Sequence, residues 1–278
     1  MIKEINWNKL SSHFKYVPAK TCLIKQGTKP SSMYVLIDGA LHTFRNDILI
    51  STIDRKGEYF GEISILMNIE HSATVISLLN STVIEINIDS IVSFLTKSPD
   101  VAISLASNLA KRLVEQNAQL ARTMEDPGLR LNLIKSKIDV IDTTGYFDLG
   151  KLSDYYVDVR PNVEFIQQGK MPKSLYILVE GEVQIIKNGK TIALESTPGY
   201  YFGDVSILRD SPANASVKTT NKTTLIEIPA EKVMSFLNHS PEVAISISKK
   251  LAQRILIINE EYLNLMAMVA KNKPLASP

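Results

Sequence analysis

The sequence has little of what disulfide-rich, metal-binding or strongly charged proteins need. Its single cysteine, Cys22, excludes an internal disulfide and favours a reducing compartment. Its histidines are His13, His42, His71 and His239, which fall at unrelated places, so the sequence predicts no metal centre. The net charge is +2 without a block of basic residues, and the sequence therefore predicts neither a nucleic-acid partner nor a membrane partner.

Long hydrophobic runs are also absent. No window approaches the roughly 18 apolar residues of a membrane-spanning helix, because Lys and Glu interrupt each candidate. Met1–Trp7 lacks the apolar region of a signal peptide, so we expect a cytoplasmic protein. Cys22 lies in the apolar run Cys22–Ile24, and we expect it in the core rather than as a nucleophile. No Ser-His-Asp or Cys-His arrangement and no glycine-rich nucleoside triphosphate loop occurs, so we expect no enzyme and no cofactor.

What the sequence does contain is an internal repeat. Tyr59–Leu66 reads YFGEISIL and Tyr201–Leu208 reads YFGDVSIL, at an offset of 203 − 61 = 142 residues. A Gly beside an acidic residue at the start of a helical turn can form a nest of backbone N–H groups that faces an anion. Other identities at the same offset, with no gap, are Gln26-Gly27 with Gln168-Gly169, Gly39 with Gly181, Ile84–Ile86 with Ile226–Ile228, and Arg112 with Arg254.

The repeat indicates a duplicated domain. The length of 278 residues agrees with about two domains, each long enough to bury its own core. We predict a first domain at residues 1–126, a linker at residues 127–146 and a second domain at residues 147–278. A short helix is expected over Leu129–Ile141 between the repeats.

Each repeat contains short strand-like runs separated by glycine, which predict a β-sandwich or jelly roll. A helical lead-in over Trp7–Tyr16 precedes them. In the second repeat Asn188-Gly189 separates two runs, which is the strongest short signal for a β-hairpin. The strands expected in the first repeat are Thr21–Gln26, Met33–Ile37, Ala40–Arg45, Ile48–Asp54, Ala73–Leu78 and Thr82–Ile86.

The apolar pattern becomes helical after each set of strands. We expect a helix over Asp89–Thr96 capped by Asp89, a longer helix from Asp100 to about Met124, and a matching helix from Pro241 to about Ala270. Apolar residues spaced 4-3-4-3-4 in the last helix form a heptad seam, for which we predict a homodimer. The alternatives are packing on its own barrel or on the first repeat's long helix. The seam residues are Leu251, Ile255, Ile258, Tyr262, Leu265 and Val269.

These features together resemble the cyclic nucleotide-binding domain. The strand Leu175–Gly181, the Phe-Gly-Glu/Asp segment with its following Ser-x-Leu, and the terminal helices are similar to the family of the bacterial cAMP receptor protein and the regulatory subunits of cAMP-dependent kinase. The resemblance covers almost the whole chain. It implies a mainly β fold with α: two tandem eight-stranded jelly-roll barrels, each with a phosphate-binding cassette and a long C-terminal helix.

The resemblance also implies site residues, here called cassette one (residues 61–74) and cassette two (residues 203–216). In the family the Glu binds the ribose 2′-OH, and the Gly with nearby N–H groups cradles the cyclic phosphate. An Arg further on binds the phosphate bidentately. The positions that match are Gly61, Glu62, Ile63, Ser64, His71 and Ser72 in cassette one, and Gly203, Asp204, Val205, Ser206, Ala213 and Asn214 in cassette two.

The chain departs from the family at the phosphate-binding Arg, whose position is taken by His71 in cassette one and Ala213 in cassette two. A hydrogen bond to a charged group contributes about 1.5–3 kcal/mol, so a cyclic monophosphate should bind roughly one to two orders of magnitude more weakly. A protonated His71 could donate to phosphate, or it is a plain loop histidine. Asp204 reaches less far than a Glu, and Arg209 is a candidate substitute for the lost Arg.

We therefore expect a non-enzymatic signalling protein that senses a cyclic nucleotide such as cAMP or cGMP, or a related nucleotide, and relays it through its long helices to an unidentified effector protein. If only one cassette binds, we expect cassette one. The alternative is a degenerate, ligand-independent module for dimerisation or docking. A third possibility is that a neutral nucleoside or a differently charged nucleotide fits better than cAMP. No helix-turn-helix is recognised after either long helix, so DNA binding is not expected.

Overall fold

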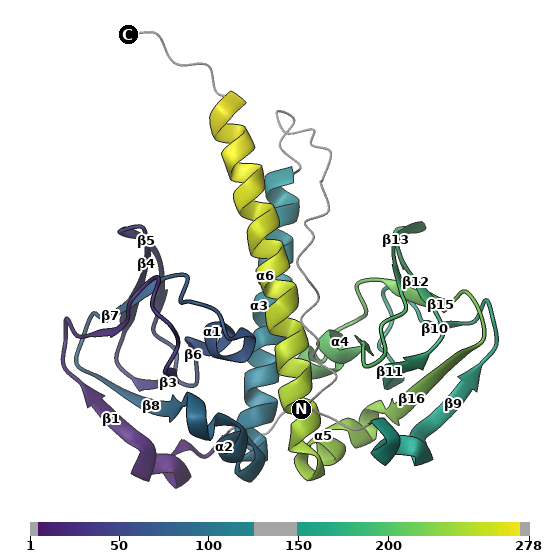
Figure 1. Cartoon of the computed structure of the whole chain (residues 1–278), viewed down its shortest axis with the longest axis horizontal. Coiled ribbons are helices and arrows are strands. Elements are labelled where there is room, and N and C mark those ends of the chain that lie inside the picture. Colours follow the sequence, from purple (N-terminus) through teal and green to yellow (C-terminus); the bar gives the residue numbers. More distant parts are fainter. Residues whose placement is uncertain (1–4, 125–148, 273–278) are drawn as a thin grey trace. The chain divides into compact units, whose positions relative to one another are not determined.

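The computed structural model describes residues 5–124 and 149–272 (Figure 1). The predicted linker and the predicted helix Leu129–Ile141 lie outside these residues. The described chain separates into two compact units, namely Met1–Asn108 with Ser235–Lys249, and Leu109–Met234 with Lys250–Pro278. These units divide both long helices, so the domain limits predicted from the sequence stay a prediction.

The first repeat folds as a β-sandwich of two four-stranded antiparallel sheets. Their strand orders are β1-β8-β3-β6 and β2-β7-β4-β5, the order of a jelly roll. A 3-10 helix at Trp7–His13 precedes the strands, and a single helical turn, α1 at Glu62–Met67, interrupts them. The strands are β1 Phe14–Val17, β2 Cys22–Ile24, β3 Ser32–Asp38, β4 Leu41–Arg45, β5 Ile48–Ile53, β6 Tyr59–Phe60, β7 Thr74–Ser77 and β8 Ser81–Asn87.

The second repeat has the same architecture, and each of its strands begins 142 residues after its counterpart, as with 156 − 14. Its sheets have the orders β14-β11-β16-β9 and β10-β15-β12-β13. A 3-10 helix at Leu149–Tyr155 precedes them, and α4 at Asp204–Arg209 matches α1. The strands are β9 Tyr156–Val159, β10 Glu164–Ile166, β11 Ser174–Glu180, β12 Val183–Lys187, β13 Lys190–Glu195, β14 Tyr201–Phe202, β15 Ser216–Thr219 and β16 Thr223–Pro229.

The interior of the sandwich is filled by the inward-facing apolar side chains of its strands. Leu36 and Leu41 face the same core as Val75 and Val83, and each of them is buried. The predicted hairpin is confirmed, because Asn188 has φ 50° and Gly189 has φ 74°, as the type I′ turn between β12 and β13 requires.

Three local predictions were wrong. The helical lead-in ends at His13, and the residues that follow form β1 because they pair with β8. Asn87, rather than Asp89, caps the helical segment, since its side chain accepts a hydrogen bond from the backbone N–H of Asp89. Cys22 is exposed rather than in the core, because the pairing of β2 with β7 shifts register between Cys22 and Ile24, and only Ile24 is buried.

Helices follow each sandwich. After β8 come a 3-10 turn at Ile88–Ser90, α2 at Ile91–Lys97 and α3 at Pro99–Met124. After β16 come α5 at Ala230–His239 and α6 at Pro241–Asn272. None of the helices in the described part of the chain is long and apolar enough to cross a membrane.

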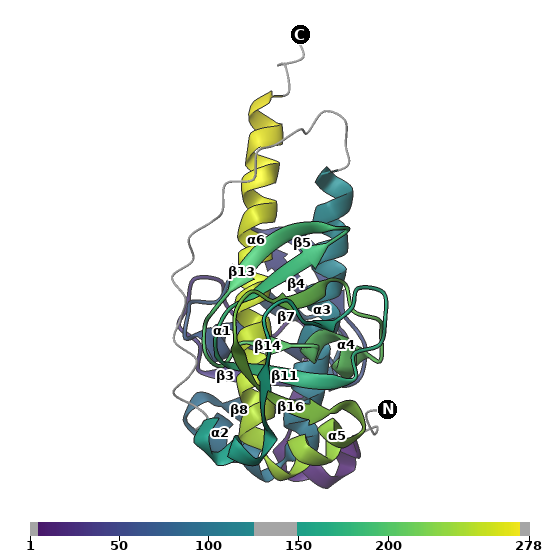
Figure 2. The same ribbon diagram turned by 90° about the vertical axis from the view of Figure 1, so that its right-hand side faces the viewer.

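The heptad seam of α6 is covered within the single chain. Leu251 and Ile255 are fully buried and Leu265 is 2% exposed. The C-terminal halves of α3 and α6 run side by side in both views (Figures 1 and 2), and the Gln119 amide lies 3.5 Å from the Tyr262 hydroxyl. The seam therefore meets the first repeat's long helix, one of the alternatives above. The homodimer stays a prediction.

Candidate functional site

Each cassette begins with a glycine in the left-handed region, at the N-cap of the short helix α1 or α4. Gly61 has φ 75° and Gly203 has φ 82°. A Cβ on Gly61 would lie 2.8 Å from Ile24 Cδ1, and one on Gly203 would lie 2.9 Å from the Ser174 carbonyl oxygen. Both the backbone conformation and the space therefore require glycine at this position.

Cassette one gathers buried polar side chains. Glu62 in the first turn of α1 is only 3% exposed, and Ser64 and His71 are also buried. Ile63 is partly buried and Ser72 is exposed. The structure thus brings Gly61, Glu62 and His71 into one region, because a Cβ on Gly61 would be 3.6 Å from His71 Cε1. The list of predicted site residues itself stays a prediction.

The His71 side chain is buried, and its burial determines the charge of the imidazole. Burial lowers the pKa of its imidazole below the ordinary 6.5, so the ring is neutral at pH 7. Its main chain is fixed, since the His71 N–H donates to Thr28 and the His71 carbonyl accepts from Gly27. His71 is therefore no plain surface histidine, and a proton on it is disfavoured.

Two residues of β4 that the sequence reasoning missed border cassette one. The Thr43 Oγ1 atom is buried and has no hydrogen-bonding partner among the described residues. Arg45 donates from Nε to the Ser72 carbonyl at 3.2 Å and from Nη2 to the Ser72 hydroxyl at 3.5 Å. The sequence signal that could have found them is that Thr43 and Arg45 are both polar, whereas the residue that matches Thr43 in the second repeat is the apolar Ile185.

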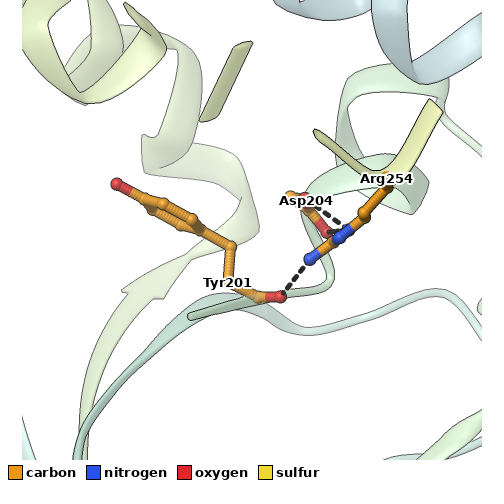
Figure 3. Close-up of polar contacts among 3 residues, drawn as sticks. All are labelled: Tyr201, Asp204 and Arg254. Carbon is orange, nitrogen blue, oxygen red and sulfur yellow. Dashed lines mark hydrogen bonds and ion pairs between the residues drawn. The ribbon is translucent and has the colours of Figure 1, made fainter. Parts of the chain in front are cut away.

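In cassette two the acidic residue forms an ion pair within the chain (Figure 3). Arg254 of α6 donates from Nη1 to both carboxylate oxygens of Asp204, at 3.0 and 3.3 Å, and from Nη2 to the Tyr201 carbonyl at 3.0 Å. The guanidinium also lies 4.8 Å from the centre of the Tyr200 ring. Asp204, the acidic residue of cassette two, is therefore already bound to a cation in this chain.

The environment of Arg254 keeps the ion pair charged. Burial is the largest single influence and opposes the charge of the guanidinium, but the Asp204 carboxylate and Tyr200 together outweigh it and raise the pKa of Arg254 above its ordinary value. The Arg254 Nε atom is buried without a hydrogen-bonding partner in the described chain. The sequence showed only that Arg112 and Arg254 match across the repeat. Only the structure shows that Arg254 pairs with Asp204, because that pairing depends on how α6 runs past α4.

The remaining residues of cassette two provide little for an anion. Ala213 is buried in the core cluster of the repeat, and Asn214 is exposed. Ser206 is buried, and its hydroxyl lies 3.5 Å from the Pro212 carbonyl, whereas Val205 is partly buried. Arg209 is exposed in the last turn of α4, and its role as an anion-binding residue stays a prediction.

Metal chemistry finds no support in the described residues, where no group of three or more His, Cys, Asp or Glu side chains could hold an ion. The two cassettes are therefore sites of hydrogen bonding and charge. Beside cassette one the Thr43 hydroxyl is buried without a hydrogen-bonding partner among the described residues, whereas in cassette two Asp204 is bound by Arg254.

The family model of the cyclic nucleotide-binding domain matches residues 14–98 and 156–240, which together are more than half of the chain. The chain therefore belongs to the cyclic nucleotide-binding domain family. Its two matched domains are regulatory and non-catalytic modules, like those of the regulatory subunits of cAMP-dependent protein kinases. The fold predicted from the sequence, two such sandwich domains with helices, is confirmed at this level.

Known proteins similar to the chain include a cAMP-dependent protein kinase regulatory subunit from Schizosaccharomyces pombe, 23% identical over 225 residues. That alignment covers 74% of this chain and 48% of the relative, so the chain spans about half of its length. A structure of the regulatory domain of Toxoplasma gondii PKA with cAMP is 17% identical, with coverages of 85% and 90% and a TM-score of 0.29. The regulatory subunit of a cAMP-independent protein kinase A from Trypanosoma cruzi, bound to guanosine, is 15% identical, with coverages of 92% and 82% and a TM-score of 0.31.

Proposed function

We propose that the chain is a non-enzymatic sensor that binds a cyclic nucleotide or a related nucleotide in cassette one. The observation that carries this proposal is the set of buried polar groups there. Glu62 and His71 are buried there, and the Thr43 hydroxyl is buried without a hydrogen-bonding partner in the described chain. In this proposal Glu62 binds a ribose hydroxyl. Buried polar groups normally have partners, so unpaired ones favour an occupant that supplies them.

Cassette two has a different role in this proposal. Arg254 binds both oxygens of Asp204, and Ala213 provides no donor for a phosphate. A ribose would have to compete with a charge-assisted ion pair, which is stronger than a neutral hydrogen bond. We therefore expect one ligand per chain, and we expect cassette two to fasten α6 to its own barrel.

The long helices are the elements through which occupancy would reach an effector. Arg254 connects α6 to the cassette of repeat two, and Tyr59 of repeat one donates to the Val101 carbonyl in α3 at 3.2 Å. Because curated relatives are named regulatory subunits of cAMP-dependent protein kinase, a kinase catalytic subunit is the first effector to test. A homodimer through α6 stays a prediction, and because most of that seam is already buried within one chain, we expect any such dimer to be weak rather than obligate.

The test is calorimetric titration of protein that has been unfolded and refolded to remove any co-purified ligand. The ligands are cAMP, cGMP and adenosine. We expect saturable binding at one site per chain, with loss of binding in Glu62→Gln and unchanged binding in the matched variant Asp204→Asn. Heat that disappears in Asp204→Asn alone would move the site to cassette two.

A second function is supported by a specific observation. Neither cassette has an arginine at the family's phosphate position, and the acid of cassette two is paired within the chain. Both facts suit a degenerate, ligand-independent module for docking to another protein. The absence of heat with every ligand would favour this function over the sensor.

A further inference from the structure

The loss of the family's arginine leaves cassette one without an obvious cation, and the neighbouring strand β4 supplies one. Cassette one runs directly into β7, which pairs with β4 in the register Thr43↔Val75 and Phe44↔Thr74. The next residues along this register are Arg45 and Ala73, immediately beside Ser72. The end of β4 therefore lies beside Ser72 of cassette one.

Alternation along β4 determines which side chains face the interior. Leu41 belongs to the core cluster of the barrel, and Thr43 lies directly opposite Val75 of the same cluster. Since side chains two apart point to the same face of a strand, Thr43 and then Arg45 follow Leu41 toward the interior and its rim. The buried, unpaired Thr43 hydroxyl agrees with this placement.

Arg45 is held in position, but only some of its hydrogen-bond donors have partners within the described chain. Its Nε and Nη2 atoms contact Ser72 at 3.2 and 3.5 Å, and it has no ion-pair partner among the described residues. The adjoining turn is clamped, because Gln26 donates to the Asn46 side chain at 2.8 Å and accepts from the Asn46 backbone N–H at 2.9 Å. A preorganised guanidinium with free donors matches the geometry of a phosphate group.

Repeat two is an internal comparison, since the same positions there lack this set of groups. Lys187 stands where Arg45 does and is exposed, and Ile185 stands where Thr43 does and packs against the core. The turn clamp alone is kept, with Gln168 donating to Asn188 at 2.8 Å. The clamp therefore serves the hairpin in both repeats, whereas the polar residues before it occur only beside cassette one.

We propose that Arg45, supplied by β4 rather than by the cassette, is the anion anchor of cassette one, and that the ligand is therefore a phosphate-bearing nucleotide. The Thr43 hydroxyl donates to the same ligand from the barrel interior, and the neutral His71 ring lines the side next to Gly61. This inference rests on the proposed function and adds to it the chemical class of the ligand and the residue that selects it.

The test compares Arg45→Gln with the matched variant Lys187→Gln in the full refolded chain. Calorimetry with cAMP and with adenosine separates the phosphate from the nucleoside. We expect Arg45→Gln to weaken cAMP by about 10- to 100-fold, as for the loss of a charged hydrogen bond, and to leave adenosine unchanged. Lys187→Gln should change neither, and Arg45→Lys should restore part of the cAMP affinity.

Each other outcome has a distinct meaning. If the unaltered chain binds cAMP and Arg45→Gln leaves that affinity unchanged, the anchor is overturned while the sensor function stands. Equal losses for cAMP and adenosine, or binding of adenosine alone by the unaltered chain, would also overturn the anchor. If the unaltered chain binds no ligand, the proposed function itself fails. Fluorescence of the buried Trp7 during urea unfolding shows whether each variant is folded.

Discussion

At the scale of single residues, the ion pair between Arg254 and Asp204 joins α6 to its barrel. Asp204 is 4% exposed, so removing Arg254 would leave a buried carboxylate without its cation. Loss of one partner of such a buried pair costs about 3–5 kcal/mol. We expect Arg254→Ala to destabilise the second repeat by about 3 kcal/mol, measured as the local opening free energy of α4 by hydrogen exchange.

The control for this prediction is Arg209→Ala, because Arg209 belongs to the same cassette but is exposed. It should change the opening of α4 by less than about 0.5 kcal/mol, as surface substitutions usually do. Comparable effects of the two substitutions would mean that the ion pair adds nothing beyond the removal of a cation.

His71 leads to a prediction about pH. Burial lowers its pKa below the ordinary 6.5, so the unfolded chain binds a proton more readily than the folded barrel does. The contribution to stability is therefore present above pH 6.5 and is lost as the pH falls below that value. Urea unfolding followed by Trp7 fluorescence at pH 7.5 and pH 5.5 should show a larger fall for the unaltered chain than for His71→Gln. An equal fall would show that His71 does not contribute.

At the scale of elements, the start of α1 depends on a glycine for two separate reasons. Gly61 and Gly27 both have positive φ, of 75° and 78°, but a Cβ would meet Ile24 and Ser32 only at Gly61. A left-handed conformation costs an alanine about 1–2 kcal/mol, so Gly27→Ala should lose about that much. We expect Gly61→Ala to lose at least about 1 kcal/mol more in urea unfolding. Equal losses would mean that Ile24 simply moves aside.

At the scale of the whole molecule, the pairing of the long helices within one chain has a measurable consequence. Leu251, Ile255 and Leu265 are buried without any second copy. The stability of an obligate dimer depends on protomer concentration, whereas that of a self-contained chain does not. We expect the unfolding midpoint to stay constant between micromolar and hundred-micromolar protein. A midpoint that rises with concentration, together with a dimeric mass in sedimentation, would restore the predicted homodimer as the stable form.

Much of the architecture was predictable because it depends on local patterns. Runs of alternating residues, the Asn188-Gly189 turn and the change to a helical period each act over a few neighbours, and the repeat confirmed each assignment a second time. The boundary of the lead-in helix was missed because Phe14–Val17 becomes a strand only through its pairing with β8. A pairing between segments about 70 residues apart leaves no local signal.

The candidate site was predictable in part. The acid, glycine and serine of each cassette are adjacent in sequence, so the motif locates them without a structure. Arg45 and Arg254 could not be found this way. Arg45 lies 27 residues before Ser72, and Arg254 lies 50 residues after Asp204, so only the folded chain brings each to its partner.

The sequence by itself determined that this protein is a duplicated chain with two β-sandwich repeats, two cassettes and two long helices; the predicted mainly β class was too narrow, because the long helices make the described chain a mixed α and β structure. That information is periodic and repeated, so it can be read from short windows. Only the tertiary structure decided which groups in those cassettes are paired. Charge and hydrogen bonding depend on distances of about 3 Å between side chains that are far apart in the chain. Contacts at this distance make the two cassettes different: the acid of cassette two is bound by Arg254, whereas unpaired donors lie beside cassette one.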